Sequence, residues 1–224
     1  MTGDPAANPE RSLALSYAPP AARRALEALL GLDDALAQLL RTTREPAVGQ
    51  LRLAWWREAL AKLDGEPAPA EPVLQALERA VIASGVQGTS LVPIVHGWEV
   101  LVEETILDRD ALRRFGGGRG QLFVVAGAAM GASPRDPLAA AGQGWALADL
   151  ARHLRVPAEA MEARAMASAL LDQATAARWS RNGRALGALA HLARLDLRAP
   201  EGSEPPIGAP HRVGRLFWHR LTGR

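Results

Sequence analysis

The sequence predicts an all-α protein with one helical domain, and three observations support this prediction. About a fifth of the 224 residues are Ala, Leu is also abundant, and both residues are strong helix formers. Val and Ile are sparse, and no segment alternates β-branched with polar residues as a half-buried strand does. Apolar residues recur at three- and four-residue spacing between Pro and Gly breaks. A chain of this length can bury a full hydrophobic core.

The composition excludes several classes of functional site. The chain contains no Cys, so it forms no disulfide, no thiolate zinc site, no iron–sulfur cluster and no cysteine nucleophile. The formal net charge is only +2, which argues against a nucleic-acid-binding protein.

Residues 1–11 lack the apolar core of a secretory signal, and the longest apolar stretch, residues 122–130, is too short to span a membrane. We therefore expect a cytoplasmic protein, and peripheral contact with a membrane stays open.

The first third of the chain divides into a lead-in and two long helices. Residues 1–19 are rich in Pro and polar residues and are expected to be irregular. A helix is predicted over residues 20–43, where Leu repeats at helical spacing. Pro46 opens a second helix that runs to Leu63, and its two apolar faces indicate burial between neighbouring helices.

The rest of the chain is predicted to form shorter helices separated by Gly and Pro. Ser90 and Ser133 are interpreted as helix starts. Three glycines at residues 116–118 are expected to interrupt a helix, because each costs about 1 kcal/mol in a helix interior. The predicted helices cover residues 72–84, 90–107, 108–114, 120–130, 133–154, 157–179, 183–197 and 211–221. The resulting divisions are the lead-in 1–19, a helical domain 20–198, and a Pro-rich linker with a basic C-terminal helix 199–224.

The most distinctive segment is QLRLAWWREAL at residues 50–60, where two adjacent Trp are flanked by Arg52 and Arg57. It resembles the signature of the squalene/phytoene synthase family, whose members carry an Arg-Leu-x-Trp-Trp-Arg-Asp stretch at this place. Residues 17–26, 97–99 and 142–152 are similar to other helices of that family. The resemblance covers residues 12–165 and implies an all-α isoprenoid synthase bundle around a deep central cavity.

The resemblance also implies what an active member needs and what this sequence lacks. Active members join two prenyl diphosphates, using two facing acidic clusters that hold magnesium against the diphosphates. The first cluster should fall near residues 37–41, which read AQLLR, and Asp33 and Asp34 lie one turn earlier. The second should follow Arg152, where His153 stands in place of Asp. The sequence therefore resembles the degenerate, non-catalytic branch of the family and predicts no metal cofactor.

Four polar residues near these positions are candidate substrate-binding residues. Arg41 and Arg152 stand where the acidic clusters stood, and two guanidinium groups at one cavity mouth repel each other unless they are neutralised. Either Asp34 and Asp149 pair with these arginines and close the mouth as a structural plug, or the mouth binds an anionic head group without metal. We favour the plug, because both acids are already close in sequence.

Aromatic residues supply a further candidate and an open question about the chain end. Trp55 is the fifth candidate substrate-binding residue, and it or Trp56 should be buried, whether in a ligand pocket or in the core. The tail around Phe217 and Trp218 mixes basic and aromatic residues. It either packs onto the bundle, which we favour, or contacts an acidic membrane surface or RNA.

The leading interpretation is a family member that has lost metal-dependent prenyl transfer and binds a lipid-like ligand or a protein partner, but not nucleic acid. The alternative is an active prenyltransferase of isoprenoid biosynthesis, in which Asp33, Asp34 and Asp149 hold Mg²⁺. An arginine-rich nucleic-acid adaptor is disfavoured, because Arg is scattered along the chain.

Overall fold

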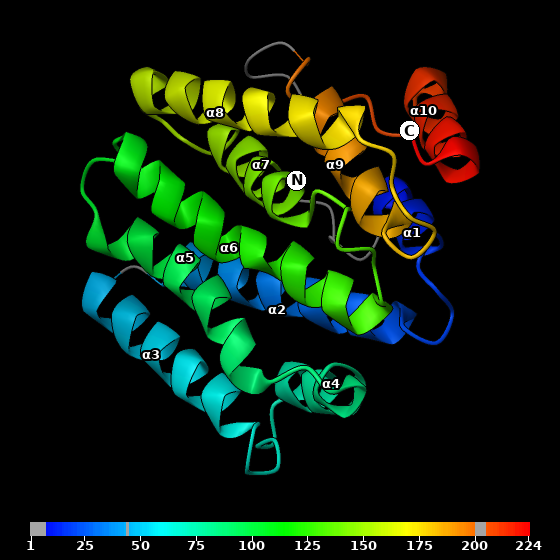
Figure 1. The fold of residues 1–224 in the computed structure, drawn as a ribbon. Helices are drawn as coiled ribbons and strands as arrows, with labels where there is room; N and C mark the ends of the chain where they lie inside the picture. Colours follow the sequence, from blue (N-terminus) through cyan, green and yellow to red (C-terminus); the bar gives the residue numbers. More distant parts are fainter. Residues whose placement is uncertain (1–7, 44, 200–204) are drawn as a thin grey trace.

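The computed structural model describes residues 8–43, 45–199 and 205–224, and these residues form helices and no strand (Figure 1). The predicted all-α class is confirmed. The α-helices are α1 (Pro9–Leu15), α2 (Arg23–Thr42), α3 (Pro46–Lys62), α4 (Pro72–Ala80), α5 (Val92–Glu103), α6 (Arg109–Met130), α7 (Leu138–Ala151), α8 (Pro157–Ala176), α9 (Arg184–Asp196) and α10 (Pro210–Thr222). Two 3₁₀ helices, η2 (Ile82–Ser84) and η3 (Gly88–Leu91), join α4 to α5.

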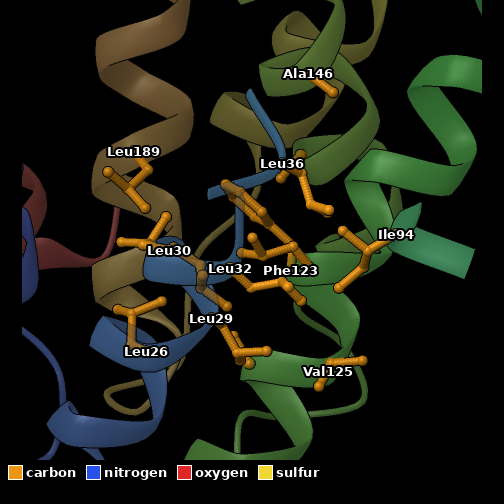
Figure 2. Close-up of a cluster of buried hydrophobic side chains, with 14 of the residues drawn as sticks. Leu26, Leu29, Leu30, Leu32, Leu36, Ile94, Phe123, Val125, Ala146 and Leu189 are labelled. Carbon is orange, nitrogen blue, oxygen red and sulfur yellow. The ribbon is translucent and has the colours of Figure 1, made fainter. Parts of the chain in front are cut away.

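Helix α6 is the central element of the bundle. It packs against α5 on one side and α7 on the other, and α2 crosses behind it (Figure 1). Helices α8 and α9 cover α7, and α3 lies on the outer side of α5. The centre of the core consists of Leu side chains from α2 that meet apolar residues of α5, α6, α7 and α9 (Figure 2). This arrangement brings one face each of α2, α6 and α7 to a common interior.

The glycine run at residues 116–118 does not interrupt α6, and that prediction is wrong. A Cβ added to Gly118 would lie 2.6 Å from the backbone nitrogen of Gly97 in α5. A Cβ added to Gly120 would lie 2.5 Å from the backbone nitrogen of Gln143 in α7. These glycines therefore let α6 approach both neighbours backbone to backbone, and the packing offsets their low helix propensity.

Several helix boundaries also differ from the predictions. The lead-in is not irregular throughout, because Asn8 caps α1 by accepting hydrogen bonds from the backbone N–H groups of Glu10 and Arg11, at 3.0 and 3.2 Å. Ser90 lies inside η3 and caps no helix. Ser133 lies in the loop before α7. Part of the predicted Pro-rich linker, residues 200–204, lies outside the described residues. Of the helices in the described chain, none has the length and apolar character to cross a bilayer.

Candidate functional site

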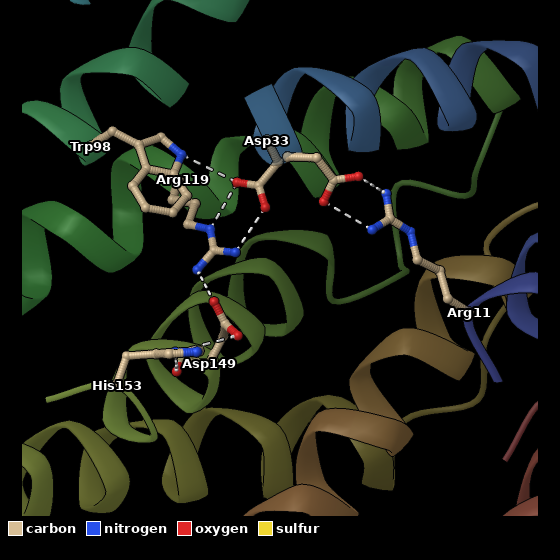
Figure 3. Close-up of polar contacts among 7 residues, drawn as sticks. Arg11, Asp33, Trp98, Arg119, Asp149 and His153 are labelled. Carbon is tan, nitrogen blue, oxygen red and sulfur yellow. Dashed lines mark hydrogen bonds and ion pairs between the residues drawn. The ribbon is translucent and has the colours of Figure 1, made fainter. Parts of the chain in front are cut away.

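A buried arginine from α6 joins α2 to α7 in the interior of the bundle (Figure 3). Arg119 donates two hydrogen bonds to the carboxylate of Asp33, from Nε at 2.8 Å and from Nη2 at 2.7 Å. Its Nη1 donates a third to Oδ2 of Asp149, at 2.6 Å. A guanidinium group suits this task because its planar fork can bind one carboxylate with two parallel bonds and still donate to another. We call these three residues the Arg119 cluster.

Aromatic rings enclose the guanidinium group of Arg119. Its Cζ lies 4.5 Å from the ring centroids of both Trp98 and Trp145, and 5.9 Å from that of Phe115. The indole Nε1 of Trp98 donates to Oδ1 of Asp33 at 3.2 Å, which fixes the carboxylate from a third direction. The faces of desolvated aromatic rings attract a cation, so these rings hold Arg119 in place together with the acids.

Burial and charge oppose each other in the Arg119 cluster. The side chains of Arg119 and Asp33 are each 5% exposed, whereas that of Asp149 is 39% exposed. Burial raises the pKa of Asp149, but neighbouring positive charges, first of all Arg119, together with the hydrogen bond from Arg119 outweigh it, so this pKa lies below its ordinary value. Burial likewise lowers the pKa of Arg119, and the two carboxylates raise it further than burial lowers it. Arg119 and Asp149 are therefore both charged at neutral pH.

The structure changes the partners that we predicted for the acids of the plug. Asp149 pairs with Arg119 and not with Arg152, whose Nη1 lies 4.0 Å from Asp196 of α9. The ring nitrogen Nδ1 of His153, one turn after Asp149, lies 2.8 Å from the backbone oxygen of Asp149. A long-range pair replaces the expected local pair because Asp149 faces α6, the helix packed against α7, and meets the buried guanidinium group of Arg119 there.

Asp34 also has a partner other than the predicted one. Its carboxylate accepts two hydrogen bonds from Arg11 of α1, at 2.9 and 2.6 Å (Figure 3). It does not pair with Arg41. Arg41 is exposed and donates to the side-chain oxygen of Gln38, one turn earlier in α2. The expected pairings of the plug are therefore wrong, and the roles of Asp34, Arg41, Asp149 and Arg152 in substrate binding stay predictions.

Trp55 lies at the outer surface of the bundle, away from the Arg119 cluster. The predicted burial of one member of the Trp pair is confirmed for Trp56, which is 8% exposed, whereas Trp55 is 46% exposed. The two rings meet edge to face, with centroids 5.3 Å apart. Trp55 lines an open groove of about 840 Å³ between α3 and the start of α5. The other residues of this groove are Leu51, Ala54, Arg57, Glu58, Ala61, Thr89 and Val92.

Comparison with known proteins gives one match. The family model described as squalene/phytoene synthase matches residues 5–195. The chain belongs to the squalene/phytoene synthase family. No curated protein and no solved structure matches it. The matched residues include all of the Arg119 cluster and stop before α10. The all-α, isoprenoid synthase-like fold expected for the family is the fold that the structure shows.

Sequence reasoning missed Arg119, although the family resemblance located the helices around it. The sequence predicts a helix break at the glycines beside Arg119, so it places this residue on no helix face. In one continuous helix, Arg119 lies one turn after Phe115 and one turn before Phe123, both fully buried. An arginine on an apolar helical stripe needs buried acidic partners, and this signal could have identified the cluster.

The residues at the centre do not fit the paired magnesium sites of active squalene/phytoene synthases. Mg²⁺ needs several oxygen ligands around one point, and here the guanidinium group of Arg119 holds the position between Asp33 and Asp149. Across residues 8–43, 45–199 and 205–224, no three His, Asp or Glu side chains converge as metal ligands. The Arg119 cluster therefore has the donors and acceptors of an internal ion-pair network.

Proposed function

We propose that this member of the squalene/phytoene synthase family does not carry out metal-dependent prenyl transfer and instead binds a lipid-like ligand. Membership of the family relates the chain to prenyl transfer at the family level. The observation that supports the loss of catalysis is the placement of Arg119 between the two facing carboxylates, at 2.7 and 2.6 Å. The ligand-binding part of the proposal rests on the groove beside Trp55.

The Arg119 cluster opposes catalysis for an energetic reason. A departing diphosphate must be neutralised, and in active family members magnesium held by acidic side chains supplies the positive charge. Here Asp33 is committed to two hydrogen bonds with Arg119 and a third with Trp98. Moving Arg119 away would leave Asp33 buried and unpaired, and breaking a buried pair costs about 3–5 kcal/mol. Metal binding would have to supply this free energy before any substrate is held.

The groove beside Trp55 has the size and lining of a site for an apolar chain. Its volume of about 840 Å³ lies within the range of small-molecule sites, and its walls are mainly Leu, Ala, Val and Trp side chains. Arg57 supplies a charge at the edge, where its Nη1 lies 3.1 Å from Glu99. Leu51 is 73% exposed and Trp55 is nearly half exposed, so a bound hydrocarbon chain would cover apolar surface that is now hydrated.

One observation favours an active prenyltransferase as the second candidate. Asp33 and Asp149 lie on different helices and face the same interior, as the two acidic groups of an active member do. An assay with farnesyl diphosphate and geranylgeranyl diphosphate in the presence of Mg²⁺ separates the two candidates. We expect no release of diphosphate above the background without protein.

Matched variants make this assay specific to the Arg119 cluster. Asp33→Asn removes a partner of Arg119, whereas Asp34→Asn changes the adjacent carboxylate, which pairs with Arg11 and not with Arg119 among the residues that the structure describes. Turnover by the wild-type protein would overturn the proposed loss of catalysis. If Asp33→Asn then abolished turnover and Asp34→Asn did not, the reaction would be located at the cluster and the second candidate would stand.

Ligand binding is tested with farnesol, an uncharged probe that needs no metal. We expect saturable binding that Trp55→Ala weakens by about tenfold or more, because the indole ring forms a wall of the groove. Ile106→Ala is the control, since Ile106 is an exposed apolar residue outside the groove. Absence of binding, or equal weakening by both variants, would contradict a ligand site in the groove.

A further inference from the structure

The C-terminal helix α10 carries a concentrated exposed apolar surface. Of the eleven large apolar side chains that are exposed in the described residues, five lie in the last segment, residues 205–224. On α10 itself they are Val213, Phe217, Trp218 and Leu221, which are 39% to 61% exposed. Their spacing of four, one and three residues places them on one side of the helix. Packing onto the bundle, which we expected for this tail, therefore holds for Leu216 but not for Phe217 and Trp218.

The opposite side of α10 is firmly attached to the rest of the protein. Arg212 donates two hydrogen bonds to Glu10 of α1, at 2.8 and 2.7 Å, and lies 2.7 Å from Asp196 of α9. At the other end of the helix, the carbonyl oxygen of Gly223 accepts a hydrogen bond of 2.7 Å from the backbone N–H of Trp179. The apolar side is thus held outward at the edge of the molecule, next to α9 and α1 (Figure 1). A partner that binds there meets a preorganised surface.

Basic residues border the apolar side of α10. Residues 205–224 contain no Asp or Glu. Arg220 and Arg224 are exposed, and Arg215 is half-buried on the other border of the apolar side. The guanidinium group of Arg220 lies 5.1 Å from the ring centroid of Tyr17, which holds it at the edge of the helix. This combination of an apolar stripe with Trp and Phe, basic borders and no acid is typical of helices that lie in a membrane interface.

We propose that α10 docks the protein on an anionic lipid bilayer, with the helix axis in the plane of the membrane. Phe217, Trp218 and Leu221 enter the boundary between head groups and acyl chains, while Arg220 and Arg224 pair with lipid phosphates. The charge pattern decides against a second copy of α10, because two such helices face to face would oppose their arginines. The aliphatic members Val213 and Leu221 suit acyl chains. Single-stranded RNA would stack on Phe217 and Trp218 only and would leave the aliphatic members without a partner.

Vesicle flotation tests the proposal with the full-length protein. We expect it to float with phosphatidylcholine vesicles that contain phosphatidylglycerol, and much less with phosphatidylcholine alone or at high salt. The double variant Phe217→Ser/Trp218→Ser should weaken binding by about tenfold or more. The double variant Arg220→Gln/Arg224→Gln should weaken it by about tenfold on the anionic vesicles only.

A matched control keeps the result specific to α10. Ile106→Ser/Met161→Ser removes two apolar side chains of similar exposure from other parts of the bundle and should bind vesicles like the wild type. Thermal melts should show that all three double variants stay folded, because the changed side chains are largely exposed. No flotation by the wild type would overturn the proposal, as would equal flotation by Phe217→Ser/Trp218→Ser. So would an α10-dependent dimer, or RNA binding by α10 in place of vesicle binding.

Discussion

Two arginines are buried in this protein with almost the same ion-pair geometry and with different consequences. Each is at most 5% exposed in its side chain, and each joins two carboxylates that come from two other helices. Arg119 lies in the part of the chain that matches the family, and Arg212 lies in α10, outside that part. The partners are Asp33 and Asp149 for Arg119, and Glu10 and Asp196 for Arg212.

The surroundings of each arginine decide its effect on the acids. Burial raises the pKa of both Asp149 and Asp196. At Asp149 the opposing positive charges and hydrogen bond, led by Arg119, outweigh burial, whereas at Asp196 those led by Arg212 do not. The Arg119 cluster lies in the interior and joins α2 to α7. Arg212 joins α10, near the end of the chain, to Glu10 of α1 and Asp196 of α9. A buried arginine between two acids therefore does not by itself indicate an active site. The residues around the cluster determine its role.

Replacement of Arg119 should give the largest effect on stability. Arg119→Met leaves Asp33 buried without its ion pair, so we expect the free energy of unfolding to fall by about 3–5 kcal/mol in urea titrations. The double variant Asp33→Asn/Arg119→Met should recover part of this loss, because a neutral amide is less costly to bury than a carboxylate. A single variant as stable as the wild type would show that the cluster contributes no net stability.

Replacement of Arg212 should act locally, in contrast to replacement of Arg119. Arg212→Met removes the pair that joins α10 to Glu10 and Asp196, while the Arg119 cluster stays intact. We expect faster hydrogen exchange in α10, residues 210–222, with little change in α6. Equal acceleration in both helices would contradict the view that the two clusters stabilise separate parts of the molecule.

Mild acid should also act mainly on the C-terminal part. Burial and the neighbouring His219 and Arg215 lower the pKa of His191 to about 3, and burial first of all lowers that of His219 to about 4. The unfolded chain binds these protons near pH 6.5, so the stability is full well above that pH. It falls as the pH drops through 6.5 to 5, by up to about 2 kcal/mol for each His. Asp149, with a lowered pKa, keeps its contribution until the pH falls below its ordinary value of 3.8.

Urea titrations at pH 7 and pH 5 measure this difference. His219→Gln should remove about half of the loss in stability between the two pH values, because one of the two buried imidazoles is gone. The double variant Asp33→Asn/Arg119→Met, which leaves no buried unpaired carboxylate at position 33, should keep the pH dependence in this range unchanged. An unchanged wild-type stability at pH 5 would mean that neither His is held in its neutral form.

The smallest expected effects come from two adjacent glycines of α6. Gly118→Ala should lower the free energy of unfolding by about 1–3 kcal/mol, because the new Cβ would meet the backbone of α5, which cannot move aside. Gly117→Ala should raise it by about 0.5–1 kcal/mol, since the position is open and Ala favours a helix. Thermal melts of both variants test the close approach of α5 and α6, and equal effects of the same sign would refute it.

The helical class, the approximate extent of most helices and the family can be predicted from the sequence alone. These depend on information within a few turns of chain, such as the spacing of Leu in α2 and the Trp pair of α3, one member of which must be buried. The burial of Trp56 and the exposure of Trp55 follow the two faces of one helix. Local sequence could not show which face would be covered.

The ion pairs of the candidate site and the continuity of α6 depend on the packing of distant segments. Arg119 meets Asp33 and Asp149 across 86 and 30 residues of chain, whereas the predictions paired neighbours on the same helix. A local ion pair at the surface contributes little to stability. Asp149 therefore pairs with the buried Arg119, which reaches both helices, and not with Arg152 of its own helix. The glycines around Arg119 weaken a helix taken alone and favour one packed against α5 and α7, because the close approach they permit exists only in the folded bundle.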